Sequence, residues 1–247
     1  MKNLAILQAR MGSSRLPGKV LREINSYPMI YWQLKRIEQS TYLDRIIVAT
    51  SNDPSDDVLC NFLAKEGFNY YRGSLTNVFS RFSDLNSTFQ PINIIRLTAD
   101  CPLIMPRMID DMLEEFESSQ FDYFSNSVMP TFPDGLDIEI FTSYALKRLE
   151  AAELTQDELE HVTLGFLSRR NDFRIANFAN DIDLANLRWT VDYDDDLRFV
   201  RDVFETFKGR ELVFGTSDVL DEIKQGHIVP ATTQNIPRNP ERNFHEI

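Results

Sequence analysis

A basic, glycine-containing loop follows the first apolar run of the chain. Residues 4–7 are apolar and predict a buried strand, and the loop after them carries Arg10, Arg15 and Lys19 among two serines and two glycines. The first 22 residues hold five basic side chains and no acidic one, although the whole chain carries a net charge of −12. Glycine lets a backbone turn its N–H groups toward an anion, and guanidinium and ammonium groups bind phosphate oxygens. The loop therefore predicts an anion site at a strand end.

The spacing of the loop residues excludes the Walker A type of phosphate-binding loop. That motif places four residues between its glycines and continues with lysine and a hydroxyl residue. Here five residues separate Gly12 from Gly18, and Val20 follows Lys19, so no hydroxyl is in place to hold magnesium. The three-glycine spacing of dinucleotide-binding proteins is absent as well. The competing interpretation is a solvated surface loop, but the strand-end position and the lack of acids favour an anion site.

Two aspartates follow or end predicted strands. Asp100 lies just beyond the run 93–97, and Asp192 ends the run 188–192. Ligands of doubly wound sheets bind beyond the carboxyl ends of the strands, and the magnesium that accompanies a polyphosphate binds to carboxylates. We therefore predict that both aspartates bind a metal near the basic loop. Capping of a helix or turn is the alternative, and it is the better interpretation for the acids at 194–196.

Strands and helices alternate in the part of the chain that must position these residues. Apolar runs at 45–50, 68–71 and 93–97 predict strands, and amphipathic runs at 54–66, 75–85 and 106–116 predict helices. This alternation indicates an α/β fold with a doubly wound, mostly parallel sheet. The second half predicts strands at 122–127, 136–141, 173–178 and 188–192 and helices at 144–153, 157–169 and 194–207. We predict one domain over 1–225, with an inserted β-arm within about 120–180, and a tail over 226–247.

Composition and charge limit the partners and the compartment. The apolar content of 43% and the charged content of 26% are typical of a soluble globular protein. The acidic balance argues against nucleic acid as a partner, because phosphate neutralisation needs clustered lysine and arginine. Cys60 and Cys101 do not make a disulfide framework. With no apolar run of ~18 residues, we expect no contact with a membrane and a cytoplasmic location.

The stretch 8–19, Gln-Ala-Arg-Met-Gly-Ser-Ser-Arg-Leu-Pro-Gly-Lys, resembles the nucleotide-binding signature of the sugar-acid cytidylyltransferases. These include CMP-KDO and acylneuraminate cytidylyltransferases, and the most similar branch contains the spore-coat polysaccharide biosynthesis cytidylyltransferases. The resemblance spans roughly residues 3–207, and its motifs occur in the expected order. Besides the opening stretch, they are 47–51, 71–74, 96–104, 135–139, 160–163 and 188–192.

The resemblance implies a GT-A-like, Rossmann-like nucleotidyltransferase fold that forms a homodimer through the inserted arm. It implies transfer of CMP from CTP to a sugar acid, with release of pyrophosphate, for surface or spore-coat polysaccharide. It also implies Mg²⁺ bound by Asp100 and Asp192, and Arg15 and Lys19 as the residues that stabilise the leaving phosphates. The residues implied in CTP binding are Ala9, Arg10, Gly12, Ser13, Arg15, Lys19, Arg72 and Ser74, of which Ala9, Arg72 and Ser74 line the base pocket. Many relatives have proline at the position of Asp194, which we interpret here as a helix cap.

Three polar residues of the second half are candidates for the acceptor site. Asp137 and Glu139 share one face of a predicted strand, where they bind sugar hydroxyls or simply face solvent. His161 lies in a predicted helix and faces the acceptor, a dimer partner or only the protein interior.

Two other classes of function remain open from the sequence. One is a GT-A-type glycosyltransferase that uses Asp192 and Asp194 as its metal motif and a nucleotide sugar as donor. The other is a catalytically inactive nucleotide-binding domain, against which the presence of both metal aspartates counts.

Overall fold

A seven-stranded sheet and a separate two-stranded hairpin organise the protein. The structure is a computed structural model and describes residues 1–236 and 238. The strands are β1 (Asn3–Gln8), β2 (Glu23–Ile24), β3 (Tyr27–Pro28), β4 (Arg45–Ser51), β5 (Tyr70–Gly73), β6 (Asn93–Thr98), β7 (Tyr123–Ser125), β8 (Glu139–Thr142) and β9 (Ile175–Asn177). The α-helices are α1 (Met29–Ile37), α2 (Asp57–Lys65), α3 (Val78–Phe89), α4 (Pro106–Ser118), α5 (Ser143–Glu150), α6 (Gln156–His161), α7 (Leu164–Ser168), α8 (Asp194–Thr206) and α9 (Thr216–Lys224). Short 3₁₀ turns are η1 (Lys19–Leu21), η2 (Pro54–Asp56) and η3 (Thr232–Asn235).

The sheet is mostly parallel, which confirms the predicted fold class. Its strand order is β5-β4-β1-β6-β8-β7-β9, and β4, β5 and β6 all run parallel to β1. Only β8 reverses direction within it: β8 is antiparallel to both β6 and β7, and β9 is parallel to β7. The carboxyl ends of β1, β4, β5 and β6 therefore lie at one edge, as the first half of the sequence predicts.

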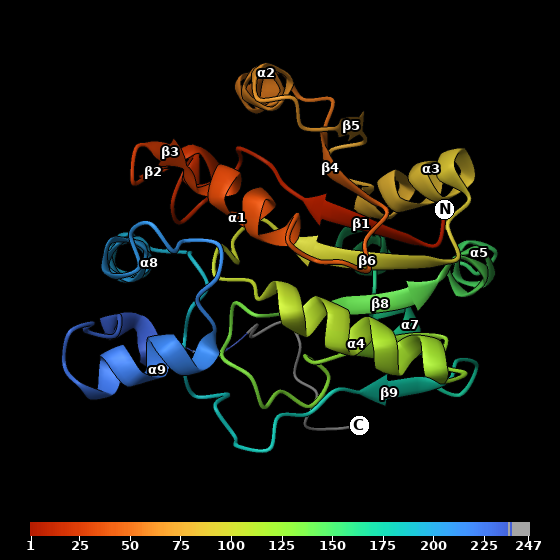
Figure 1. Cartoon of the computed structure of the whole chain (residues 1–247). Helices are drawn as coiled ribbons and strands as arrows, with labels where there is room; N and C mark the ends of the chain where they lie inside the picture. The colour runs from red at the N-terminus through yellow and green to blue at the C-terminus, as the bar shows by residue number, and fades with distance from the viewer. Residues whose placement is uncertain (237, 239–247) are drawn as a thin grey trace.

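Alternating side chains of the central strands build a hydrophobic core on each face of the sheet. In β1, Ala5 and Leu7 belong to the core under α1, α4 and α8, whereas Leu4 and Ile6 belong to the core under α3, α5 and α7. All four are fully buried. Figure 1 shows α1 and α4 lying along one face of the sheet and α3 and α5 beside its other side. This two-sided burial explains why the strand reads as a continuous apolar run.

Residues 120–180 form the far half of the same sheet. Their strands β7, β8 and β9 are hydrogen-bonded into it, next to β6. The segment predicted as an inserted arm thus lays its strands in the central sheet, and its part in a homodimer, like the domain boundaries, stays a prediction.

The predicted helix over 157–169 is divided into α6 and α7. The division falls at Val162, a buried β-branched residue with φ +46°. Such a residue rarely adopts positive φ, so neighbouring contacts must stabilise the backbone of Val162 in this conformation. The turn lets the Thr163 hydroxyl donate to Glu139 Oε1 at 2.6 Å. The break thus serves a buried polar contact with β8.

The predicted strand over 188–192 is wrong. Arg188 makes an isolated bridge with Asp134, and residues 189–192 pair with no strand in the described part of the chain. The Trp189 N–H donates to the Asp134 carbonyl at 2.6 Å, and the Val191 N–H donates to the Asp100 carbonyl at 2.8 Å. The segment is extended because it crosses the loops beyond the strand ends, not because it joins a ladder.

Part of the predicted tail packs against α8. Ile228 and Ala231 are buried, and the hydroxyls of Thr232 and Thr233 donate to Asp195 and Asp196 at the start of α8. The end of the predicted tail, 237 and 239–247, lies outside the described residues. Across 1–236 and 238, none of the helices has the length and apolar character needed to cross a lipid bilayer.

Candidate active site

The basic loop after β1 folds back on itself at Gly18. The Gly18 N–H donates to the Met11 carbonyl at 3.1 Å, and Gly18 has φ +68°, which glycine adopts without strain. Asp56 holds the other end by accepting the Met11 N–H at 2.7 Å. Gly12 is not required for space, since a Cβ there would meet nothing within 4 Å. The loop closes so that Lys19, the first residue of η1, turns toward the end of β6.

Lys19 lies between the two aspartates predicted to bind metal. Its Nζ is 3.2 Å from Asp100 Oδ2, 2.9 Å from Asp192 Oδ1 and 2.8 Å from the Val191 carbonyl oxygen. Burial by itself lowers the pKa of Lys19, but the charges of the two carboxylates outweigh it and raise that pKa. The ammonium is therefore charged, and the three predicted residues meet at one point.

Asp100 is an ionised carboxylate. Burial alone would raise its pKa, but the Lys19 charge and hydrogen bonds from Thr98, Lys19 and Cys101 lower the pKa of Asp100 to about 2. Thr98 donates to Asp100 Oδ1 at 2.6 Å. A carboxylate held ionised at a strand end is suited to bind a cation.

The carboxylate of Asp192 is held by arginines. Arg188 donates to Asp192 Oδ2 at 2.8 Å and to Asp134 Oδ2 at 3.0 Å, and Arg15 lies 3.1 Å from Asp192 Oδ1. Burial by itself lowers the pKa of Arg188, but Asp196, Asp134 and Asp192 raise it. Arg15 and Lys19, the residues predicted to stabilise the leaving phosphates, therefore share one carboxylate.

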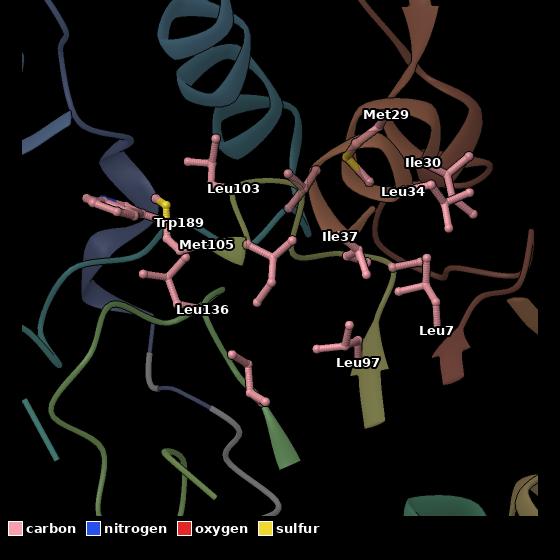
Figure 2. Packing of buried hydrophobic residues seen from close by; sticks show 14 of the residues in the cluster. Leu7, Met29, Ile30, Leu34, Ile37, Leu97, Leu103, Met105, Leu136 and Trp189 are labelled. Carbon is pink, nitrogen blue, oxygen red and sulfur yellow. The ribbon is translucent and has the colours of Figure 1, made fainter. Parts of the chain in front are cut away.

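The segment that carries Asp192 packs tightly against a glycine. Gly135 has φ +110°, and a Cβ there would lie 2.4 Å from the Thr190 nitrogen and 2.5 Å from the Trp189 carbonyl carbon. Trp189 is 2% exposed and packs into the core beside Met105 and Leu136 (Figure 2). The close contact at Gly135 and the buried Trp189 side chain together fix the position of Asp192 beyond the end of the sheet.

Two cavities meet at these residues. One, of about 240 Å³, is lined by the loop residues Arg10, Gly12, Ser13, Arg15 and Lys19 together with Gln8, Ala9, Ser14, Val20, Val78, Arg81, Thr98, Ala99, Asp100 and Asp192. The other, of about 510 Å³, extends toward β8 and α6. It shares with the first cavity the lining residues Gln8, Arg10, Ser14, Arg15, Val78, Thr98, Asp100 and Asp192. Asp194 lines neither cavity and begins α8.

The donor set suits a divalent cation. One oxygen of Asp100 and one of Asp192 face the same cationic nitrogen of Lys19, which marks a position where positive charge is stable. Within the described ranges, no group of three or more His, Cys, Asp and Glu side chains is arranged for a metal. Two carboxylates, with phosphate and water completing the shell, are the ligands Mg²⁺ takes at nucleotide sites.

The larger cavity contains all three residues predicted for the acceptor. Asp137, Glu139 and His161 line it, with Glu160 and Arg96 nearby. Glu139 is buried at the cavity wall, where it pairs with Arg96 and accepts from Tyr123 at 2.7 Å. Asp137 pairs with Arg238.

Asp134 also lines the larger cavity. Burial and the charge of Asp137 raise the pKa of Asp134 to about 7, although Arg238 and Arg188 oppose them. Asp134 therefore ionises less readily than an ordinary aspartate on the acceptor side.

Arg72 and Ser74, predicted to line the base pocket, lie outside both cavities. Arg72 donates to the carbonyls of Ser51 and Asp53 and pairs with Asp57 at 2.6 Å. The Ser74 hydroxyl accepts the Asn77 N–H at 3.0 Å. Their contact with a base stays a prediction.

Sequence reasoning missed several polar side chains that line the cavities. These are Arg81 of α3, Arg96 of β6, and Arg188 and Asp134 beyond the sheet. Arg96 points inward from a strand with an apolar neighbour on each side, which is a signal for a buried charge. Arg81 has no such signal, because an arginine on an amphipathic helix is ordinarily a solvent-facing residue.

One known relative matches most of the chain, and another matches about half of it. The spore coat polysaccharide biosynthesis protein SpsF of Bacillus subtilis (strain 168) is 31% identical over 211 residues, covering 82% of this chain and 86% of that protein. The 3-deoxy-manno-octulosonate cytidylyltransferase of Fusobacterium nucleatum subsp. nucleatum is 34% identical over 121 residues, covering 49% of this chain and 48% of that enzyme.

Solved structures share the fold. A cytidylyltransferase from Leptospira borgpetersenii superposes with a TM-score of 0.86 at 30% identity, covering 92% of this chain and 95% of that one. A CMP:2-keto-3-deoxy-manno-octonic acid synthetase complexed with CTP has a TM-score of 0.61 at 19% identity and covers 83% of this chain and 99% of that one; it shows the fold alone.

The sequence pattern of one family matches residues 4–210, which include the basic loop, Asp100 and Asp192. This range also contains the strands of the sheet, apart from the first residue of β1, and the segment that positions Asp192. The chain belongs to the cytidylyltransferase family and is a nucleotidyltransferase.

Proposed function

We propose that this enzyme transfers CMP from CTP to an acidic sugar and releases pyrophosphate. The observation that carries the proposal is the meeting of Lys19, Arg15, Asp100 and Asp192 at the junction of two cavities. One cavity has the cations that a triphosphate needs, and the other opens beside the aspartates with polar groups for a second substrate. The names of the SpsF protein and of the Fusobacterium enzyme support a sugar acid as acceptor and surface or spore-coat polysaccharide as the destination.

The basic loop is proposed to hold the triphosphate. Arg10, Gly12, Ser13, Arg15 and Lys19 all line the smaller cavity. Arg15 contacts Asp192, and the phosphates of CTP would take up its remaining N–H donors. The three N–H groups of Lys19 already meet Asp100, Asp192 and the Val191 carbonyl, so Lys19 would act on the phosphates through its positive charge. A hydroxyl of the acceptor attacks the α-phosphorus in line, the bond to the β-phosphate oxygen breaks, and the hydroxyl proton is released. Arg15 and Lys19 lower the barrier by neutralising charge on the departing pyrophosphate.

Asp100 and Asp192 are proposed to hold Mg²⁺. When bound, the ion supplies charge neutralisation at the α-phosphate. The two carboxylates are fixed for this task by Thr98 on one side and Arg188 on the other. Arg188 is itself held at a second point by Asp134, so it orients Asp192 rather than contacting a phosphate.

The larger cavity is proposed to bind the acceptor. Asp137, Glu139 and His161 line it on the side away from the basic loop. Glu139 is held by Arg96, Tyr123 and Thr163. Its proposed role is therefore to shape the cavity wall rather than to bind the sugar. Asp137 and His161 are the proposed partners of sugar hydroxyls. The base is proposed to lie near Ala9, with Arg72 and Ser74 as further predicted contacts.

A homodimer in the cytoplasm, without nucleic acid as a partner, completes the proposal. The resemblance of the opening stretch 8–19 to enzymes that are usually dimeric supports the homodimer, and the acidic charge of the chain argues against nucleic acid. Light scattering after size exclusion would measure the assembly, and a monomeric mass would refute the dimer.

Pyrophosphate release tests the proposal. Each of the four nucleoside triphosphates is incubated with Mg²⁺ and a panel of acidic sugars that includes 3-deoxy-manno-octulosonate and N-acetylneuraminate. We expect release with CTP and one acid, and none when either is omitted. Release that requires no acid, or no release with any acid, would refute the acceptor. The glycosyltransferase alternative has less support, because Asp194 is the first residue of α8 and lies outside both cavities. Asp194 is not the cap that the sequence predicts: Tyr193 is the N-cap residue, and Asp196 accepts the backbone N–H of Tyr193 at 2.9 Å.

A further inference from the structure

Asp134 is a carboxylate of the larger cavity that lies beside the proposed metal site. Its residue is 9% exposed, and it lines that cavity together with Asp100 and Asp192. Arg188 donates to Asp134 Oδ2 at 3.0 Å and to Asp192 Oδ2 at 2.8 Å, so the two carboxylates flank one guanidinium. Asp134 therefore stands where the proposed acceptor site meets the metal site.

The backbone fixes Asp134 relative to the metal aspartates. The Trp189 N–H donates to the Asp134 carbonyl at 2.6 Å, and two residues later the Val191 N–H donates to the Asp100 carbonyl at 2.8 Å. The close contact at Gly135, directly after Asp134, presses the same segment against this loop. One short segment thus holds Asp134 and Asp100 at a set separation, as a group that must meet a bound hydroxyl requires.

One oxygen of the Asp134 carboxylate is available to a ligand. Oδ2 accepts from Arg188. Oδ1 lies 3.8 Å from Arg238 Nε, which is beyond hydrogen-bond distance, and it accepts from no donor among residues 1–236 and 238. A carboxylate oxygen with unused lone pairs can accept the proton of a hydroxyl.

The other carboxylates of this cavity are less suited than Asp134 to receive a proton. The two metal aspartates both face the Lys19 ammonium. Glu139 accepts from two hydroxyls and pairs with a buried arginine. Asp137 pairs closely with an arginine of the C-terminal segment, and Glu160 is exposed on α6.

The surroundings of Asp134 also make it a stronger base than an ordinary aspartate. Burial and the charge of Asp137 raise the pKa of Asp134, although Arg238 and Arg188 oppose them. A general base is most effective when its pKa lies near the working pH rather than far below it.

We propose that Asp134 is the general base that takes the proton of the attacking acceptor hydroxyl. This inference rests on the transfer of CMP to an acceptor, as proposed above. The acceptor oxygen bonds to the α-phosphorus while its proton moves to Asp134 Oδ1, and the electron pair of the breaking P–O bond leaves with pyrophosphate. Asp134 then returns the proton to the solvent.

Asp134→Asn tests the proposal. Its amide oxygen still accepts from Arg188, but the amide takes up no proton. A positioned general base contributes about 100- to 10,000-fold, so kcat for pyrophosphate release should fall ~100-fold or more, with the KM of CTP unchanged. The assay contains CTP, Mg²⁺ and the panel acid that gives the highest wild-type rate. Wild-type kcat in this variant would overturn the inference, since Asp134 would then act only through Arg188.

The matched control is Asp122→Asn. Asp122 is 6% exposed and its carboxylate lies 3.3 Å from Arg174 Nε, but it lines neither cavity. This variant should keep the wild-type kcat. An equal loss of kcat in both variants would overturn the inference, because it would show a general effect of losing a buried carboxylate.

Chemical rescue separates proton transfer from positioning and does not depend on the first variant. Asp134→Ala leaves room for a small carboxylate, so added formate should raise its kcat by at least ~10-fold in a saturable way, and should not raise that of the wild type or Asp122→Ala. No effect of formate on an Asp134→Ala protein that binds CTP like the wild type would overturn the inference. No release by the wild type with any acid would instead refute the proposed function, and the inference with it.

Discussion

Replacing Lys19 by methionine should cost both stability and turnover. Methionine keeps most of the side-chain volume but leaves Asp100 and Asp192 facing each other without the ammonium that lies 3.2 and 2.9 Å from them. Burial opposes the ionisation of Asp100, yet Lys19 and the hydrogen bonds lower its pKa from 3.8 to about 2. At roughly 1.4 kcal/mol per pH unit, this shift corresponds to about 2 kcal/mol of stability at pH 7. Because the folded pKa is the lower one, this stabilisation is complete above pH ~4 and disappears as the pH falls toward 2.

A double-mutant cycle measures the share of Lys19 in that stabilisation. Urea unfolding of the wild type, Lys19→Met, Asp100→Asn and the double variant at pH 7 should give a coupling energy of about 1–3 kcal/mol. The control, Lys35→Met, removes an exposed lysine that pairs with Glu38 on α1 and should change stability by less than about 0.5 kcal/mol. Stability changes that simply add would show that Lys19 and Asp100 do not act on each other.

The same variant tests catalysis. Removal of one charge-stabilising donor costs about 100- to 1000-fold in turnover, so pyrophosphate release by Lys19→Met should fall by that factor. Circular dichroism would verify that the fold is intact. Wild-type release from a folded Lys19→Met protein would refute the role of Lys19.

Three further changes test other parts of the site. Gly135→Ala places a Cβ 2.4 Å from the Thr190 nitrogen and should lower the free energy of unfolding by about 2 kcal/mol or more, and a wild-type urea midpoint would contradict the packing. Asp100→Asn should abolish Mg²⁺-dependent pyrophosphate release; a Mg²⁺ titration of the release like that of the wild type would argue against metal binding there. Arg36→Met leaves the buried carbonyls of Ile104 and Phe214 without a donor and should cost about 3 kcal/mol in thermal unfolding, with CTP affinity unchanged.

Local signals were sufficient to predict one side of the site. The strand before the basic loop is buried on both faces, so it reads as an apolar run, and Asp100 follows a strand of the same kind. Because the carboxyl ends of parallel strands lie at one edge of a sheet, the basic loop and Asp100 are both placed at that edge.

Long-range contacts explain what could not be predicted. Asp192 is positioned at the site by the hydrogen bond between the Val191 N–H and the Asp100 carbonyl. The run 188–192 contains tryptophan and β-branched residues, so it has the composition of a strand whether or not it pairs with a neighbouring strand. Arg81 is buried because Gly73 opposite it leaves room, and that pairing is invisible to helical periodicity.

The bond between Val191 and Asp100 has a kinetic consequence. It joins residues 91 positions apart, and Lys19 closes a still longer loop to Asp192. Contacts of such separation form late, since the entropy of closing the loop must be overcome before they stabilise anything. During refolding, helical signal should therefore return before the ability to release pyrophosphate, and the interval between the two reports the docking of the 188–192 segment onto an already folded sheet.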